Sequence, residues 1–119
     1  MLVRTPSWLS PSRYGRLAES AAAWSLRLRG YRIVGRNVRV AGREVDLLAR
    51  RGSLLVICEV KARRTPVRGT PLEAVGPNKQ RRLREAAEVL MAGDPSVEQV
   101  RFDVIAVDGG GVHHLPAAF

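Results

Sequence analysis

The chain has 119 residues, enough for one domain with a sizeable core and too few for two. Its hydrophobic fraction of 45% excludes wholesale disorder, and no apolar run approaches the roughly 18 residues of a membrane span. No signal-peptide block opens the chain, and the lone Cys58 fits a reducing compartment. We therefore expect a cytoplasmic protein without membrane association.

The formal net charge is +9, and most of the excess lies in residues 1–51. A basic excess of this size attracts polyanions, and nucleic acid is the commonest polyanion inside a cell. The alternative source of the charge is a GC-rich genome, which enriches arginine throughout a proteome. Charge alone therefore favours a nucleic-acid partner without requiring one.

The chain opens with a flexible arm, predicted over residues 1–13 from their prolines and serines, ahead of a single domain over residues 14–119. A helix is predicted over residues 16–29, where apolar residues recur at helical spacing before Gly30. The face expected to pack on a sheet comprises Leu17, Ala18, Ala21, Ala22, Ala23, Trp24, Leu26 and Leu28.

Alternating and β-branched segments predict five strands, at residues 31–40, 43–49, 54–61, 100–107 and 112–115. The second and third of these form a hairpin. A loop rich in proline and glycine, residues 65–77, then precedes a second helix over residues 78–91. The inner stripe expected for this helix is Leu83, Ala86, Ala87 and Leu90. The resulting order is α-β-β-β-α-β-β.

Four charged residues stand on the two apolar runs of the hairpin, Glu44 and Asp46 on the first and Glu59 and Lys61 on the second. Side chains alternate across a strand, so each pair points to one face of its own strand. Buried carboxylates are unfavourable unless a cation pairs with them. A divalent metal is one such partner, and Mg²⁺, or Mn²⁺ in its place, takes one or two carboxylates together with substrate phosphate.

The hairpin turn decides which carboxylates meet. A two-residue loop that begins at Arg51 sets Glu44 opposite Glu59, whereas one that begins at Gly52 sets Asp46 there. Either register gathers carboxylates within reach of one ion. The metal ligands expected from this pattern are Asp46 and Glu59, with Glu44 in support.

A bound ion lowers the pKa of a water molecule and stabilises charge on a phosphate. The ammonium of Lys61 could orient the attacking water or neutralise negative charge in the transition state. Glu-x-Lys alone is a weak signal, because Glu59 and Lys61 also suit an ordinary exposed pair on an edge strand. Glu44 and Asp46 likewise suit a solvated face near a turn.

Other polar residues have less specific assignments. Glu19, the only acid in the first helix, either supports the site or caps the helix. Adjacent His113 and His114 face opposite sides of a strand and are expected to be passive. Lys79, near a helix N-terminus, suits either a solvated position or a phosphate contact. The residues expected to grip phosphates are Arg63, Arg64, Lys79, Arg81 and Arg82.

From residue 15 to residue 119 the chain resembles the YraN family of small bacterial proteins. The motifs that carry the resemblance are GREVDLLAR at residues 42–50, CEVKAR at 58–63, GTPLEAV at 69–75, RFDV at 101–104 and HHLPAAF at 113–119. This family belongs to the restriction-endonuclease-like superfamily and is related to archaeal Holliday-junction resolvases.

The resemblance implies an α/β fold of the restriction-endonuclease-like type, with a mixed central sheet flanked by helices. It implies that Asp46, Glu59 and Lys61 occupy the superfamily's metal and catalytic positions. Glu19 corresponds to the acid that some resolvases add from the first helix. Val45 stands where many superfamily nucleases have proline, a residue that shapes the strand and ligates nothing.

These inferences predict a nucleic-acid-binding, Mg²⁺-dependent endonuclease that acts on structured or branched DNA, with DNA favoured over RNA. A homodimer suits that activity, because junction resolution needs two cuts related by symmetry. One alternative is a nucleic-acid-binding module on the same fold that has lost turnover. The other is a protein-interaction adaptor with a basic surface.

Overall fold

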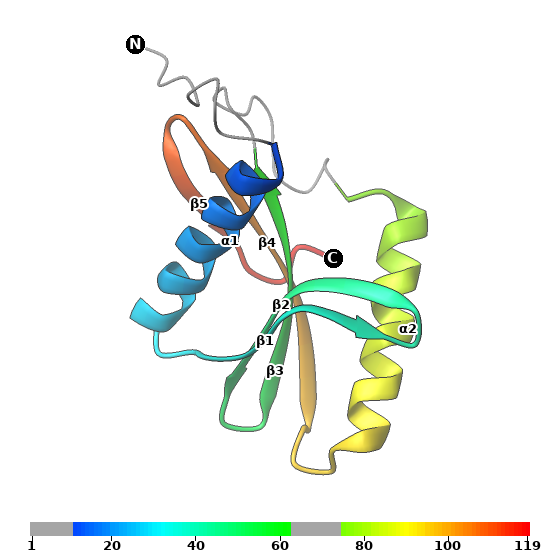
Figure 1. The fold of residues 1–119 in the computed structure, drawn as a ribbon. Helices are drawn as coiled ribbons and strands as arrows, with labels where there is room; N and C mark the ends of the chain where they lie inside the picture. The colour runs from blue at the N-terminus through cyan, green and yellow to red at the C-terminus, as the bar shows by residue number, and fades with distance from the viewer. Residues whose placement is uncertain (1–10, 63–74) are drawn as a thin grey trace.

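The computed structural model describes residues 11–62 and 75–119 (Figure 1). Its elements are α1 (Pro11–Leu28), β1 (Arg32–Val40), β2 (Arg43–Arg51), β3 (Leu54–Ala62), α2 (Pro77–Gly93), β4 (Gln99–Asp108) and β5 (Gly111–Leu115). The order α-β-β-β-α-β-β is the predicted one. Within the described ranges, neither helix combines the length and apolarity that crossing a bilayer requires.

The N-terminal boundary of the first helix differs from the sequence prediction. Most of the predicted arm, residues 1–10, lies outside the described residues, but α1 begins at Pro11 and so takes in residues 11–13. Proline suits the first turn of a helix, where its missing N–H would have no partner. The predicted loop is described only from residue 75 onward.

The five strands form one mixed sheet in the order β1-β2-β3-β4-β5. Strands β3 and β4 are parallel and are joined through α2, whereas the other neighbouring pairs are antiparallel. The two helices cover opposite faces of the sheet (Figure 1). This is the helix-flanked mixed sheet that the family resemblance implies.

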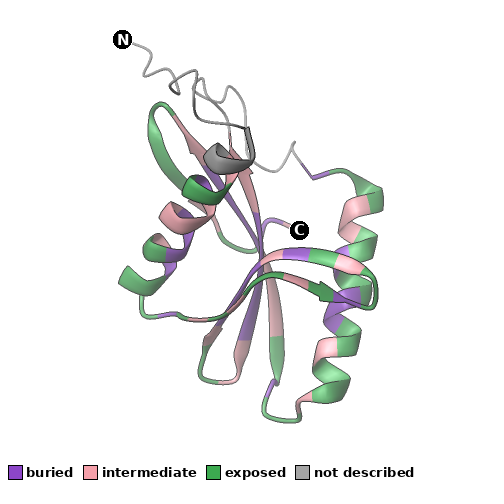
Figure 2. Ribbon diagram, in the orientation of Figure 1, coloured by how far each residue is buried: buried purple, intermediate pink, exposed green. Residues whose placement is uncertain are grey.

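Helix α1 packs on the sheet through its small residues. The buried residues are Ala18, Ala22, Ala23 and Leu26. The large residues Leu17, Trp24 and Leu28 are instead 58%, 61% and 84% exposed. Figure 2 colours the exposed stretches of α1 green. The prediction that these three face the sheet was wrong, because alanines let the helix axis approach the strands closely and turn the bulky residues outward.

The β2–β3 hairpin turns at Gly52 and Ser53, which selects between the two predicted registers. Arg51 pairs with Leu54, and the ladder ends where Leu47 pairs with Cys58. Gly52 has a φ of +61°, a left-handed conformation that glycine adopts without strain. The register is therefore the one that directs Asp46 towards Glu59.

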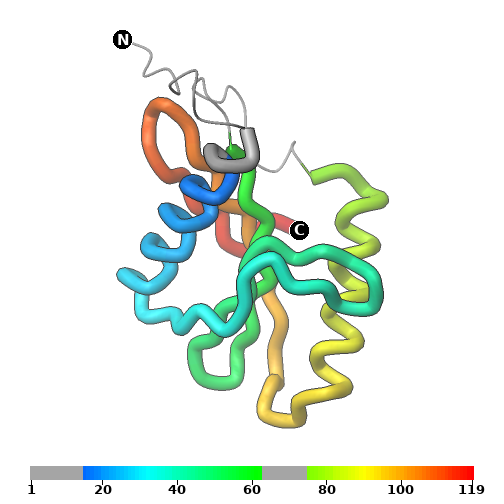
Figure 3. Tube along the Cα trace, viewed as in Figure 1, coloured from blue at the N-terminus to red at the C-terminus, as the bar shows by residue number. Residues whose placement is uncertain are grey.

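Strand β2 leaves β3 beyond this last pair and continues with β1 as a hairpin towards α2 (Figure 3). Arg43, at the start of β2, forms an ion pair with Glu85 of α2 at 3.0 Å. Strand β3 meanwhile stays paired with β4 as far as Ala62. The sheet therefore divides between β2 and β3, and the division falls at Asp46 and Glu59.

A second buried carboxylate, Asp103 on β4, anchors the C-terminal residues. It is 0% exposed and receives two hydrogen bonds from Arg101, both at 2.8 Å. His114 Nε2 lies 2.7 Å from Oδ2, and the backbone N–H of Ala117 donates to Oδ1 at 3.1 Å. Burial alone raises the pKa of Asp103, but these hydrogen bonds lower it below its usual value. His114 thus takes part in this anchoring contact.

Replacing Asp103 with asparagine is expected to lower the free energy of unfolding by about 3 kcal/mol near neutral pH, because the change removes the fully buried partner of half-buried Arg101 and an amide cannot accept all the hydrogen bonds that the carboxylate receives. A carboxyl whose folded-state pKa is lowered stabilises the fold above its unfolded pKa, and the contribution disappears as pH falls through the folded value. The difference between wild type and variant should therefore narrow below about pH 4. Urea denaturation near pH 7 and below about pH 4 measures this difference, with the exposed Glu98→Gln as the control. An equal difference at both pH values would contradict the assignment.

Candidate functional site

The candidate site lies at the division between β2 and β3, which we call the fork and define by Asp46, Glu59 and Val60. Here the side chain of Asp46 replaces a backbone partner, since its Oδ2 accepts a hydrogen bond from the backbone N–H of Val60 at 2.9 Å. This contact satisfies a backbone donor that β2 no longer pairs. It also fixes the Asp46 carboxylate beside the next strand.

Glu59 is the central residue of the fork and is only 3% exposed. Its Oε1 lies 2.6 Å from Nζ of Lys79, on α2, and 3.5 Å from Nζ of Lys61, on its own strand. No described residue donates a hydrogen bond to its Oε2. A buried carboxylate oxygen without a donor is uncommon in a folded protein and marks a position where a cation would be stabilised.

Asp46 and Glu59 lie close enough for their carboxyl groups to share a proton. Burial, and after it the negative charge of Glu59, raises the pKa of Asp46 from 3.8 to about 7. The hydrogen bond from Val60 opposes this rise without cancelling it. Two ionised carboxylates both accept hydrogen bonds, so together they require a proton or a cation between them.

The carboxyl pair fits a hard divalent ion. Mg²⁺ commonly takes one or two protein carboxylates and fills its other positions with water and phosphate. Among residues 11–62 and 75–119, no group of three or more His, Cys, Asp and Glu side chains is placed to hold a metal. Of the side chains that the structure describes, a site at the fork would therefore draw on the carboxylates of Asp46 and Glu59, with one oxygen of Glu59 lacking a described donor.

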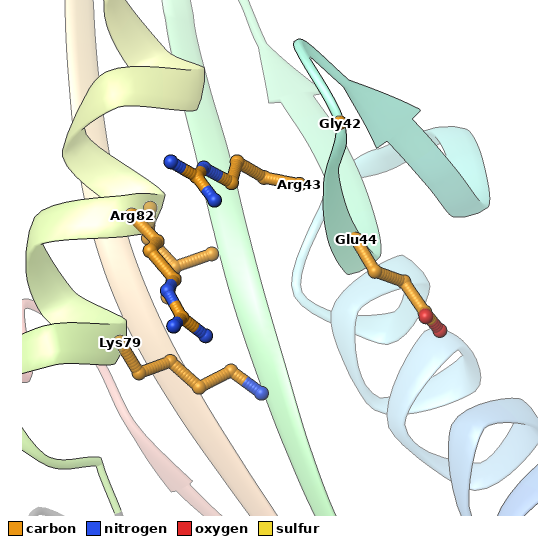
Figure 4. Close-up of a pocket in the computed structure, with 6 residues that line it drawn as sticks. Gly42, Arg43, Glu44, Lys79 and Arg82 are labelled. Carbon is orange, nitrogen blue, oxygen red and sulfur yellow. The ribbon is translucent and has the colours of Figure 1, made fainter.

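Glu44 and Glu19, also expected near the metal, do not form a group with the carboxyl pair among the described residues. Glu44 is exposed, and its carboxylate points away from α2 in Figure 4. Glu19 accepts a hydrogen bond of 2.7 Å from Asn37 on β1. Asn37 lies across from Asp46 in the β1–β2 register and has a φ of +49°, which asparagine tolerates better than most residues. Glu19 thus links α1 to β1 next to the strand that carries Asp46.

A basic pocket of about 190 Å³ adjoins the fork and is lined by Gly42, Arg43, Glu44, Lys79, Arg82 and Leu83. Arg82 and Lys79 extend from α2, and Arg43 extends towards them from the β1–β2 hairpin (Figure 4). Lys79 belongs to both places, because it lines the pocket while its ammonium contacts Glu59. The acidic fork and the basic pocket therefore lie side by side.

The predicted phosphate-binding residues separate into three groups. Lys79 and Arg82 line the basic pocket, whereas Arg81 lies on the same helix and donates to Asn78 at 2.8 Å. Arg63 and Arg64 lie outside the described residues.

Sequence reasoning missed Arg43 in the pocket and the contact of Lys79 with Glu59. Arg43 directly precedes the acidic motif, so its position was a usable signal. The contact of Lys79 was not, because it joins residues 20 positions apart on different elements.

Comparison with known proteins identifies the family. The model of the uncharacterised protein family UPF0102 matches residues 18–107, which include the whole fork and Lys79. The chain belongs to the UPF0102, or YraN, family. This membership confirms the resemblance inferred from the motifs.

Two UPF0102 proteins from bacteria illustrate the similarity. One from Anaeromyxobacter dehalogenans is 46% identical over 110 residues, covering 88% of this chain and 82% of its own length. One from Symbiobacterium thermophilum is 48% identical over 99 residues, covering 82% of this chain and 84% of its own. Each alignment therefore covers more than four fifths of this chain and of the relative.

In metal-free protein, Asp46→Asn is expected to increase the free energy of unfolding at about pH 8 by about 1 kcal/mol, after allowance for solvent screening. Asparagine keeps the acceptor for Val60 N–H and removes a charge beside Glu59. The folded-state pKa of Asp46 is about 7, against an ordinary 3.8. Protonated Asp46 therefore stabilises the wild-type fold at low pH, and this contribution is lost as pH rises through 7. The gain should therefore vanish near pH 4. Urea denaturation in EDTA tests this, and a loss of stability at high pH would refute it.

Proposed function

We propose that the protein is a divalent-metal-dependent nuclease that hydrolyses phosphodiester bonds in structured or branched DNA. The observation that carries the proposal is the fork, where Asp46 and the buried Glu59 face one another and Glu59 Oε2 has no described donor. Two carboxylates in this arrangement repel each other and lose that repulsion when a cation binds. The net charge of +9 provides the long-range attraction for a polyanionic substrate.

The two carboxylates of the fork and the neighbouring Lys61 have distinct roles in this proposal. Asp46 and Glu59 would hold Mg²⁺ or Mn²⁺ through their carboxylate oxygens. The ion, when bound, supplies Lewis-acid stabilisation of the phosphate and a more acidic water molecule. Lys61 projects from the same strand, 3.5 Å from Glu59, and is half-buried, so its ammonium is placed to stabilise negative charge that develops on the phosphate.

The basic pocket would bind the phosphate backbone beside the reacting bond. Arg82 is exposed and lines this pocket together with Arg43, whose ion pair with exposed Glu85 is solvated and easily exchanged for a phosphate contact. Backbone contacts of this kind fix the position of a nucleic acid without reading its sequence. Cutting both sides of a junction needs two such sites, so we propose a homodimer for that substrate.

Substitution of the fork tests the enzymatic proposal. Asp46→Ala, Glu59→Gln and Lys61→Ala are each expected to reduce Mg²⁺-dependent cleavage by about 100-fold or more, because each removes a group that holds the ion or stabilises the phosphate. The measurement uses labelled linear, forked and four-way DNA, with RNA of the same sequence, in Mg²⁺, Mn²⁺ and EDTA.

Exposed Glu88 on α2 offers a matched control, since Glu88→Gln makes the same chemical change away from the fork. This variant should cleave like wild type. If folded wild-type protein cuts none of these substrates in either metal, the proposal of a nuclease is refuted.

A second candidate is a nucleic-acid-binding module that no longer hydrolyses its ligand. The ion pair between Lys79 and Glu59 favours it, because a lysine already compensates the buried carboxylate without a metal. Such a module would bind DNA in a salt-sensitive manner, and binding would survive Asp46→Ala. Retained binding with no cleavage by wild type would therefore select this candidate.

The pocket predicts a difference between two adjacent arginines. Arg82→Ala is expected to weaken DNA binding and to lower the slope of log K against log salt by about 1, because one phosphate contact is lost. Arg81→Ala should have a smaller effect, because Arg81 lies outside the pocket and contacts Asn78. Fluorescence anisotropy at several salt concentrations measures both, and equal slopes for the two variants would contradict the assignment of the pocket.

A further inference from the structure

Lys79 connects the fork to the basic pocket. Its ammonium lies 2.6 Å from Glu59 Oε1, closer than that of Lys61 at 3.5 Å, and its side chain lines the pocket with Arg82 (Figure 4). The Lys79 side chain is 43% exposed, whereas that of Glu59 is 4% exposed. The lysine therefore has room to turn away, and the buried carboxylate does not.

The place of Lys79 in the chain is unfavourable in the absence of an anion. It stands in the first turn of α2, which contains no acidic residue, and a cation there opposes the helix dipole. Partial burial alone lowers the pKa of Lys79, but the hydrogen bond and the charge of Glu59 raise it above its ordinary value. Glu59 is thus the anion that keeps the ammonium in place, and a phosphate in the pocket would be an equivalent partner.

A divalent cation at the fork would compete with this ammonium. Both bind the carboxylate of Glu59, and two positive charges on one carboxylate repel each other strongly where water is scarce. The cation would take Oε2 while Lys79 holds Oε1, so this repulsion favours release of the lysine towards a new anionic partner. The pocket places Arg82 and Arg43 beside it, where a phosphate group would be stabilised by all three cations.

We propose that Lys79 is a positioning residue that occupies Glu59 in the metal-free protein and transfers its ammonium to a nucleic-acid phosphate in the basic pocket when a divalent cation binds. This inference rests on the proposed metal site. It assigns Lys79 a role beyond a simple phosphate contact, because it makes the binding of the metal and of the nucleic acid depend on each other.

Thermodynamic linkage makes the dependence reciprocal. A nucleic acid that draws Lys79 away from Glu59 strengthens metal binding, and a metal that displaces Lys79 strengthens nucleic-acid binding by the same factor. Couplings of this kind commonly amount to about 5- to 150-fold in affinity. Removing the ammonium removes both the competition and the coupling.

The first arm of the test is calorimetric titration of Mn²⁺ into full-length protein without nucleic acid. Lys79→Met is expected to bind Mn²⁺ about tenfold more tightly than wild type, because no ammonium has to be displaced. Arg39→Met, which removes one positive charge from an exposed position on β1, should leave the Mn²⁺ affinity nearly unchanged. Glu59→Gln should abolish the binding and so locate the ion at the fork.

The second arm measures the affinity for a labelled short duplex DNA by anisotropy, with and without Mn²⁺. All proteins carry Lys61→Ala, so that the DNA stays intact. With Lys79 present, Mn²⁺ should tighten DNA binding by at least about fivefold, whereas with Lys79→Met the effect of Mn²⁺ should largely disappear. The protein that retains Lys79 tests the coupling by itself, even if the methionine variant folds poorly.

The outcomes separate this inference from the proposed function. Mn²⁺ binding that is lost in Glu59→Gln but unchanged or weaker in Lys79→Met would overturn the role of Lys79 and leave the metal site standing. DNA affinity that is insensitive to Mn²⁺ with Lys79 present would do the same. Failure of both wild type and Lys79→Met to bind Mn²⁺ would overturn the metal site and this inference together.

Discussion

The proposed site depends on the burial of the Glu59 carboxylate and on the charges that surround it. Glu59 is only 3% exposed and follows the buried apolar residues 55–58 on β3, so water screens its charge poorly. Lys79 compensates one oxygen, and Asp46 adds a second negative group rather than relieving the first. The proposed chemistry rests on this arrangement, in which one oxygen of the buried carboxylate has no donor among the described residues.

Two buried carboxylates in this protein show how a structural role differs from a proposed functional one. Asp103 receives four hydrogen bonds and fastens the C-terminal residues to β4. Glu59 is almost equally buried, yet one of its oxygens has no donor among the described residues. Complete hydrogen bonding of a buried carboxylate stabilises the fold. A buried carboxylate oxygen without a donor instead gains free energy when it binds a cation.

The site also depends on the sheet dividing at one place. Strand β3 remains paired with β4, while β2 follows β1 towards α2, and the Asp46 side chain satisfies the backbone of Val60 between them. The left-handed conformation of Asn37 and its contact with Glu19 lie directly behind this point. The bend that opens the fork also brings Arg43 to α2, so the geometry of the carboxylates and that of the basic pocket have one cause.

The sequence by itself determined the order of the elements, the family and the pairing of acids with a lysine on adjacent strands. These features are local, since they follow from alternation, turn residues and motif spacing. The tertiary structure decided which face of α1 is buried, which of the two hairpin registers forms, and that Lys79 reaches Glu59. Each of these depends on how closely elements distant in the chain approach one another. That distance is set by packing against the sheet, and no single segment of the sequence encodes it.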